Sequence, residues 1–238
     1  MKKVLVSFTI LAMLAMSSCL ITSIHPFYNP EDMVYEASLT GSWIDEDSCI
    51  WTIEKEMVSD EFMGPEYPTK SYRITYHEED GTLSQLIGTL FKLNGMYYAD
   101  FYPDPDEDHH FSDFTSMHHF PTHTLARTDV SSDSIMLYWY GEEWLADLFE
   151  QNRIRIKHET VGIGTDYERH LLTAKTDDLQ KFITKYANSP KTGIDVDEIF
   201  AKGEANADKD WGDTGAFLKL KPYDGPLPEK KAIQVEAN

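Results

Sequence analysis

The sequence predicts a mainly β protein built as an antiparallel meander, with two short helices and a flexible C-terminal tail. Apolar and polar residues alternate over several segments between Leu39 and Leu172, as in strands with one buried face. Tight-turn dipeptides separate some of these segments, and two others show helical spacing. The 238 residues provide enough chain for one domain with a sizeable core.

The strands are predicted from period-two patterns. Each run places its apolar residues on one parity, which we expect to face inward. The runs contain Cys49, Trp51 and Ile53; Tyr72, Ile74 and Tyr76; Leu83, Ile87, Phe91 and Leu93; Ile135, Leu137 and Trp139; and Ile154 and Ile156.

Hairpin turns are predicted at Asp80-Gly81 and Asn94-Gly95. Both central residues of a type I′ turn need a positive φ angle, which Asn, Asp and Gly tolerate best. Gly162 and Gly164 are suited to a further hairpin, between residues 153–160 and 168–174.

Two segments have helical spacing. One apolar stripe contains Trp144, Leu145, Leu148 and Phe149, and a second contains Leu179, Phe182, Ile183 and Tyr186. After Pro190 the composition changes, so we expect residues 191–238 to form an acidic, poorly structured tail. The best candidates for burial in that tail are Ile199-Phe200 and Ala216-Phe217-Leu218.

The N-terminus has the pattern of a secretory signal peptide. Lys2 and Lys3 precede an apolar run over residues 4–16 and the small residues Ser17-Ser18. The run is too short to span a bilayer. With Cys19 directly after it, the segment resembles a bacterial lipoprotein signal, which implies cleavage after residue 18 and a lipid on Cys19. Residues 19–36 are then expected to form the lipidated N-terminus and a tether, broken by Pro26 and Pro30.

The charge of the chain limits its partners. It has 41 acidic and 21 basic side chains, a formal charge of −20. Loss of residues 1–18 removes two lysines and no acid, which leaves −22. This charge repels nucleic acids and anionic lipid surfaces, so no nucleic-acid partner is expected. Solubility in the envelope accounts for the acidity, and a cationic partner or divalent cation is the alternative.

Leu39-Thr40-Gly41-Ser42-Trp43 opens the first strand. A Gly-x-Trp before about eight antiparallel strands resembles the lipocalin, or calycin, barrel. The resemblance implies that Gly41 and Trp43 close one end of a barrel over residues 37–190, and that Trp43 stacks on Arg155 or Arg169.

Further segments extend the resemblance to a group of envelope lipoproteins that have a lipocalin-like domain and no assigned activity. These segments are His25-Pro26-Phe27-Tyr28, Trp51-Thr52-Ile53-Glu54, Leu93 to Asp100, Trp144 to Ile154, and Leu172 to Phe182. No catalytic residue is implied.

Histidines gather in one window, at His109, His110, His118, His119 and His123. Imidazole binds zinc and copper, which makes His118, His119 and His123 the candidate ligands. Pro121 argues against one helical face, and the spacing matches no closed ligand set, so we expect a polar loop and no metal. The acidic runs at Asp104–Asp108 and Asp208–Asp213 lack the order of a calcium loop. No nucleophile elbow or dinucleotide loop is present, so no cofactor is expected. An enzymatic activity would rest only on the histidine-rich window and is the weakest interpretation of the sequence.

The candidate ligand-binding residues are aromatic: Tyr72, Tyr76, Phe91, Tyr97, Phe101 and Trp139. An eight-stranded barrel fills itself with side chains or holds one small ligand. The sequence therefore predicts a lipid-anchored, non-enzymatic binding module for a small apolar ligand or lipid. The alternative is a structural or partner-binding lipoprotein with a filled barrel. Leu20 and Ile21 after the cysteine favour an outer-membrane anchor that faces the periplasm.

Overall fold

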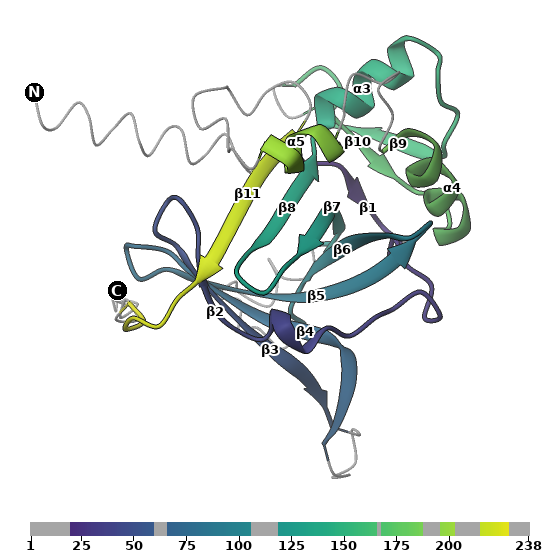
Figure 1. Cartoon of the computed structure of the whole chain (residues 1–238). Helices are drawn as coiled ribbons and strands as arrows, with labels where there is room; N and C mark the ends of the chain where they lie inside the picture. The colour runs from purple at the N-terminus through teal and green to yellow at the C-terminus, as the bar shows by residue number, and fades with distance from the viewer. Residues whose placement is uncertain are drawn as a thin grey trace, which may run out of the picture.

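A closed antiparallel barrel of eight strands forms the centre of the protein (Figure 1), and this arrangement is compatible with a lipocalin-like fold. The computed structural model describes residues 20–59, 66–105, 119–165, 168–187, 196–202 and 215–228. The barrel order is β6-β5-β4-β3-β2-β11-β8-β7, and β7 pairs again with β6. The predicted mainly β fold with an antiparallel meander is therefore confirmed. The strands are β2 (Gly41–Ile44), β3 (Ile50–Val58), β4 (Tyr67–His77), β5 (Leu83–Leu93), β6 (Met96–Pro103), β7 (His123–Val130), β8 (Ile135–Tyr140) and β11 (Gly215–Pro222).

The predicted turns connect these strands. Between β5 and β6, Asn94 has φ 50° and Gly95 has φ 83°, the two positive angles that a type I′ turn requires. Between β4 and β5, Gly81 has φ 84°. Local chemistry thus sets the register of this part of the meander, in which Leu93 pairs with Met96.

The last barrel strand lies in the segment where we expect a tail. β11 pairs with β8 over six residues and with β2 at Lys221 and Pro222. The barrel therefore continues beyond residue 190, where the sequence predicts that it ends. Leu218 and Leu220 face the barrel core and alternate with Lys219 and Lys221, a strand pattern that the polar composition of the segment obscures. Residues 203–214 and 229–238 of the expected tail lie outside the described residues.

The N-terminal segment packs on the barrel from its first described residue. Leu20 bridges Gly141, and β1 (Thr22–Ser23) pairs with β7. Ile21 and Phe27 are fully buried, and Met33 bridges Phe91 of β5. Residues 20–36, which we expect to be a tether, thus form part of the fold, and a short 3₁₀ helix, η2 (Ala37–Leu39), leads into β2.

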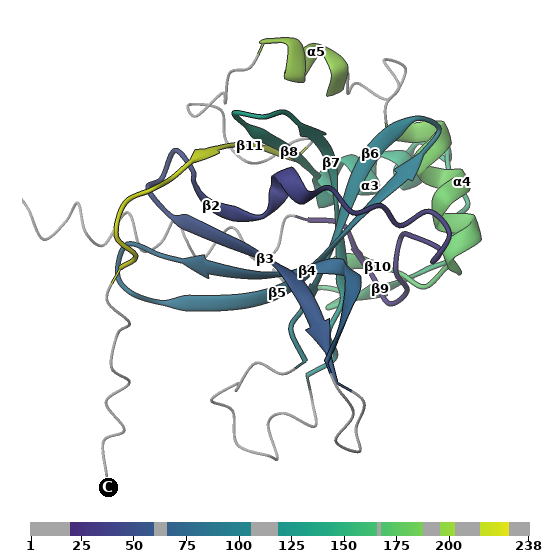
Figure 2. The same cartoon turned by 60° about the horizontal axis from the view of Figure 1, so that its bottom comes forward.

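Helices and a second hairpin cover one side of the barrel wall (Figures 1 and 2). The two predicted helices are confirmed as α3 (Glu142–Glu150) and α4 (Thr176–Tyr186), and a third, α5 (Val196–Lys202), follows. The hairpin joins β9 (His158–Val161) and β10 (Arg169–Leu172), and β10 also pairs in parallel with β1. The predicted strand begins only at His158, while Ile154 is buried ahead of it.

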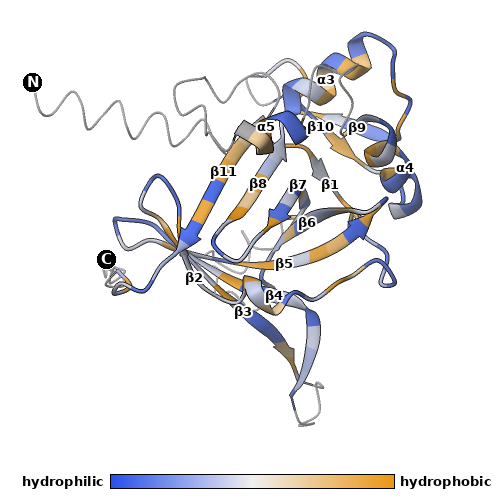
Figure 3. Cartoon of the chain, viewed as in Figure 1, coloured by the Kyte–Doolittle hydropathy of each residue, from blue (hydrophilic) through white to orange (hydrophobic). Residues whose placement is uncertain are grey.

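The protein has two apolar cores. One fills the barrel, and the other lies between the outer wall of the barrel and the helices. Figure 3 shows apolar and polar residues mixed along the same strands. None of the helices in the described ranges has the length and apolar character needed to cross a bilayer.

Candidate functional site

The barrel interior is the place where a ligand would bind in a fold of this kind, and aromatic side chains fill much of it. The rings of Trp51 and Tyr76 meet edge to face at 4.9 Å, and Phe101 lies 5.4 Å from Trp139. Trp51 and Trp139 are 6.2 Å apart, which connects the two pairs. Such contacts make one continuous aromatic cluster across the interior.

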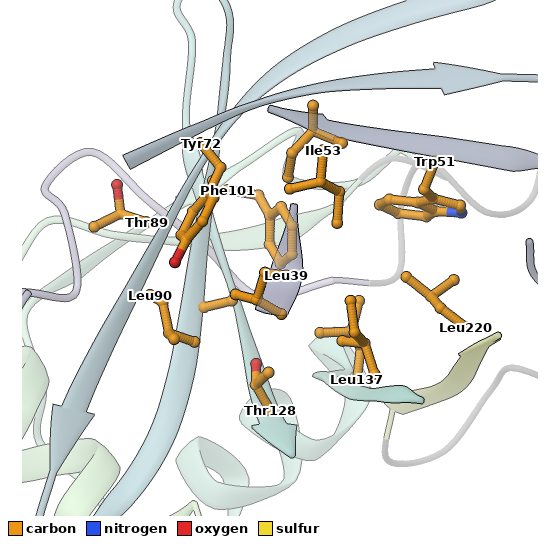
Figure 4. Close-up of a pocket in the computed structure, with 14 residues that line it drawn as sticks. Leu39, Trp51, Ile53, Tyr72, Thr89, Leu90, Phe101, Thr128, Leu137 and Leu220 are labelled. Atoms are coloured by element: carbon orange, nitrogen blue, oxygen red, sulfur yellow. The ribbon is translucent and has the colours of Figure 1, made fainter. Parts of the chain in front are cut away.

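The interior retains a cavity of about 40 Å³ (Figure 4). Its open surface is entirely apolar. Its wall comes from the inward positions of β3 to β8 and β11, closed by η2. The lining residues are Leu39, Trp51, Ile53, Tyr72, Ile74, Gly88, Thr89, Leu90, Ala99, Phe101, Thr128, Ile135, Leu137 and Leu220.

Two small residues border this space. Gly88 on β5 and Ala99 on β6 both line the cavity where larger side chains would project into it. A Cβ atom on Gly88 would lie 2.6 Å from Cδ1 of Ile74. The cavity therefore depends on the absence of a side chain at residue 88 as well as on the aromatic residues.

Trp43, which the Gly41-x-Trp43 pattern predicts to close one end of the barrel, is buried in the barrel core. Trp43 is 4% exposed, and its Nε1 donates a hydrogen bond of 2.9 Å to the carbonyl oxygen of Leu39. Arg155 and Arg169, the expected stacking partners, are exposed and lie before and in the β9–β10 hairpin, which does not neighbour β2. The contact that holds the indole is thus made by the backbone of η2.

Two tyrosine hydroxyls, those of Tyr72 and Tyr97, bind Glu36 at the barrel wall, and we call this arrangement the Glu36 clamp. The backbone N–H of Glu36 donates to Oη of Tyr72 at 2.6 Å, and Oη of Tyr97 donates to its carboxylate at 3.1 Å. Burial raises the pKa of Tyr72 to about 12, so its hydroxyl stays protonated and available as a donor. Val34 donates a backbone hydrogen bond to Leu90, which continues the closure along β5.

The six aromatic candidates divide between the two cores. Tyr72, Tyr76, Phe101 and Trp139 belong to the barrel interior, and Tyr97 packs against it at the Glu36 clamp. Phe91 differs: it is fully buried in the outer core, where it stacks on Tyr98 at 5.6 Å. Both faces of β5 are covered, so its aromatic residue alone does not identify the inward face.

A buried acid–base pair lies outside the barrel cavity. Nδ1 of His123 is 2.7 Å from Oδ1 of Asp100, and the N–H of Phe27 donates to Oδ2 at 2.9 Å. Burial raises the pKa of Asp100, opposed by its hydrogen bond to His123. Because both carboxylate oxygens are occupied, the pair holds β6, β7 and the N-terminal segment together.

The histidine candidates for a metal are not brought together among the described residues. His119 is exposed at the start of its segment, His123 is bonded to Asp100, and His118 lies outside the described residues. Within the described ranges, no three His, Cys, Asp or Glu side chains are grouped to hold a metal ion.

A second polar pair joins α3 to β10 and has no signal in the sequence. Glu142, the first residue of α3, accepts hydrogen bonds from the backbone and from Nδ1 of His170, the latter at 2.8 Å. Desolvation raises the pKa of Glu142. The Phe149 ring is tilted against His158 at 3.8 Å and stacks on His170 at 4.9 Å, so these side chains pack α3 against the hairpin.

Cys49 is free and buried, and burial raises the pKa of its thiol, which disfavours the nucleophilic thiolate. Cys19 lies outside the described residues.

Comparison of the chain with known protein families, with curated proteins and with solved structures finds no match in any of the three.

Proposed function

We propose that the protein is a lipid-anchored envelope protein whose barrel is a filled, rigid scaffold that presents its surface to a protein partner. The small size of the barrel cavity, about 40 Å³, carries this proposal. Pockets for drug-sized ligands have volumes of about 300 to 1,000 Å³. A cavity of about 150 Å³ accommodates one benzene molecule in an engineered protein, so the space here is well below that of a preformed ligand site.

The position of Cys19 supports attachment through a lipid. The described fold begins at Leu20, the next residue, so cleavage before Cys19 would leave every described strand in place. With its formal charge of −20, the chain has no electrostatic attraction to anionic lipids, and attachment then depends on the acyl chains. We assign the anchor to the outer membrane, facing the periplasm, from the residues after Cys19.

Membrane fractionation tests the anchor. The Cys19→Ser variant should leave the membrane fraction, because it lacks the thiol that carries the lipid. If the variant remains with the membranes to the same extent as the wild type, the lipid attachment is wrong.

Native mass spectrometry of the protein purified from its host tests the filled barrel. We expect only the mass of the lipidated chain, and no saturable binding of a fluorescent fatty acid. A co-purified apolar molecule, or binding that saturates at one equivalent, would contradict a filled barrel.

A second candidate function is the binding of a small apolar ligand or lipid chain end inside the barrel. The exposed surface of the cavity is apolar, which favours this candidate, because an apolar cavity stays dry and accepts apolar guests. Xenon is a suitable probe, and Ala99→Leu, which projects into the cavity, is the matched control. This candidate would be favoured if the wild type binds both xenon and the fatty acid and Ala99→Leu binds neither.

A further inference from the structure

Cys19, the proposed site of the lipid, directly precedes the first residue that pairs with the sheet. Leu20 already bridges Gly141, and the N–H of Ile21 donates to the carbonyl oxygen of Tyr140 at 3.0 Å. Ile21 is fully buried. Consecutive Cα atoms lie about 3.8 Å apart, so an acylated Cys19 is one residue from the sheet.

On the basis of the proposed lipid attachment through Cys19, we propose that the domain lies directly on the bilayer in one orientation. The end that carries Leu20, the start of α3 and the tip of the β9–β10 hairpin faces the lipid headgroups. Ile163, at the tip of that hairpin, enters the interface. The occupant of this surface is the bilayer that holds the lipid.

Strand register places the hairpin tip at the anchor's end of the molecule. β1 runs parallel to β10 with Thr22 opposite Leu171, so Leu20 is level with Arg169. Arg169 pairs with Val161, and the chain continues outward from that pair to Ile163. Ile163 lies two residues beyond that pair, so at about 3.3 Å per residue it reaches at most about 7 Å beyond the level of Leu20. The headgroup region of one leaflet is about 5 to 7 Å deep, so this reach matches it.

The tip holds its apolar side chain outward. Ile163 is 74% exposed and stands between Gly162 (φ 73°) and Gly164 (φ 75°). The turn is ordered, because the N–H of Thr165 donates to the carbonyl oxygen of Gly162 at 3.0 Å. One exposed isoleucine is common on protein surfaces. Its position beside the anchor distinguishes this one.

The other charges at this end are mixed. Glu143 and Glu168 are exposed there, as is Arg169. Carboxylates are not attracted to anionic lipid, so a projecting apolar tip is the favourable contact in this region. The acyl chains supply attachment, and the short connection supplies orientation.

Depth-dependent fluorescence quenching tests the orientation. The lipidated full chain, in a Cys49→Ala background, is labelled with an environment-sensitive dye at Ile163→Cys. The control carries the dye at Ser132→Cys, an exposed residue in the β7–β8 turn. That turn is at the opposite end of β8, about 17 Å or more from Gly141. Both proteins are reconstituted into phosphatidylethanolamine and phosphatidylglycerol vesicles that contain nitroxide-labelled lipid.

We expect severalfold stronger quenching at residue 163 than at residue 132. A flexible Gly/Ser insert of about 15 residues between Cys19 and Leu20 spans about 20 Å and should abolish this difference while the protein stays in the membrane. Equal quenching at the two sites, or a difference that survives the insert, would overturn the orientation alone. Membrane retention of Cys19→Ser would overturn both the orientation and the anchor.

Discussion

Replacement of Leu220 by alanine tests whether β11 completes the barrel. Leu220 is fully buried and lines the barrel cavity. Loss of three carbon groups from an apolar site costs about 2.4 kcal/mol at about 0.8 kcal/mol per group. If the cavity of about 40 Å³ doubles, the added volume costs about 1 kcal/mol more at about 24 cal/mol per Å³. The free energy of unfolding should therefore fall by about 3 to 4 kcal/mol.

Urea denaturation followed by tryptophan fluorescence measures this change. With a slope of about 3 kcal/mol per molar urea, the midpoint should fall by about 1 M. Leu227→Ala is the matched control: Leu227 is 48% exposed, and its loss should change stability by no more than about 0.5 kcal/mol. If Leu220→Ala behaves like this control, β11 does not insert between β2 and β8.

Three further predictions concern the site and the polar groups. Gly88→Ala should change the free energy of unfolding by less than about 1 kcal/mol in a melting experiment. The added methyl group displaces Cδ1 of Ile74, which can turn into the cavity, and alanine also lowers the entropy of the unfolded backbone. A loss of several kcal/mol would show that the Ile74 side chain cannot move into the cavity. The pKa of Tyr72 is raised to about 12 in the folded state, so its contribution to stability should be fully present below pH 10 and be lost between pH 10 and 12. Stability should fall less steeply over this range in Tyr72→Phe. Identical plots of stability against alkaline pH for the two proteins would refute this. Burial raises the pKa of Asp100 in the folded state, so the wild type should gain stability relative to Asp100→Asn as the pH falls from 7 toward the unfolded-state pKa near 3.8. Parallel plots of stability against pH for the two proteins would contradict this. The same comparison in a His123→Gln background removes the imidazole that is bonded to Asp100.

The strands were predictable from sequence to the extent that each had one apolar face. β3 is such a case, since Trp51 and Ile53 face the barrel core as expected, with Thr52 and Glu54 on the other face. β5 is the contrary case, because Leu90 faces inward while Phe91 packs in the outer core. Periodicity shows that two parities exist, but it does not show which face closes into a barrel when a second layer covers the other face.

Of the six aromatic candidates, four face the barrel core, and of these Tyr72 and Phe101 line the cavity. The capacity of the cavity was not predictable from the sequence. Free space in a core depends on how neighbours interlock, and one methyl group changes it. Here it depends on the contact between Gly88 and Ile74 and on Leu220 from the expected tail. None of these contacts has a local signal in the sequence.

The N-terminal segment shows why proline content alone does not make a linker. Pro26 prevents regular structure, but its carbonyl oxygen accepts a hydrogen bond of 2.8 Å from Oγ1 of Thr176. Phe27 donates its N–H to Asp100 and accepts from Nε2 of Gln180. Side chains from the wall and from α4 thus satisfy backbone groups that a strand ladder would otherwise satisfy. A segment without repeating structure is in this way held against the barrel wall and α4, so a lipid placed next to it would hold the whole domain rather than the end of a flexible chain.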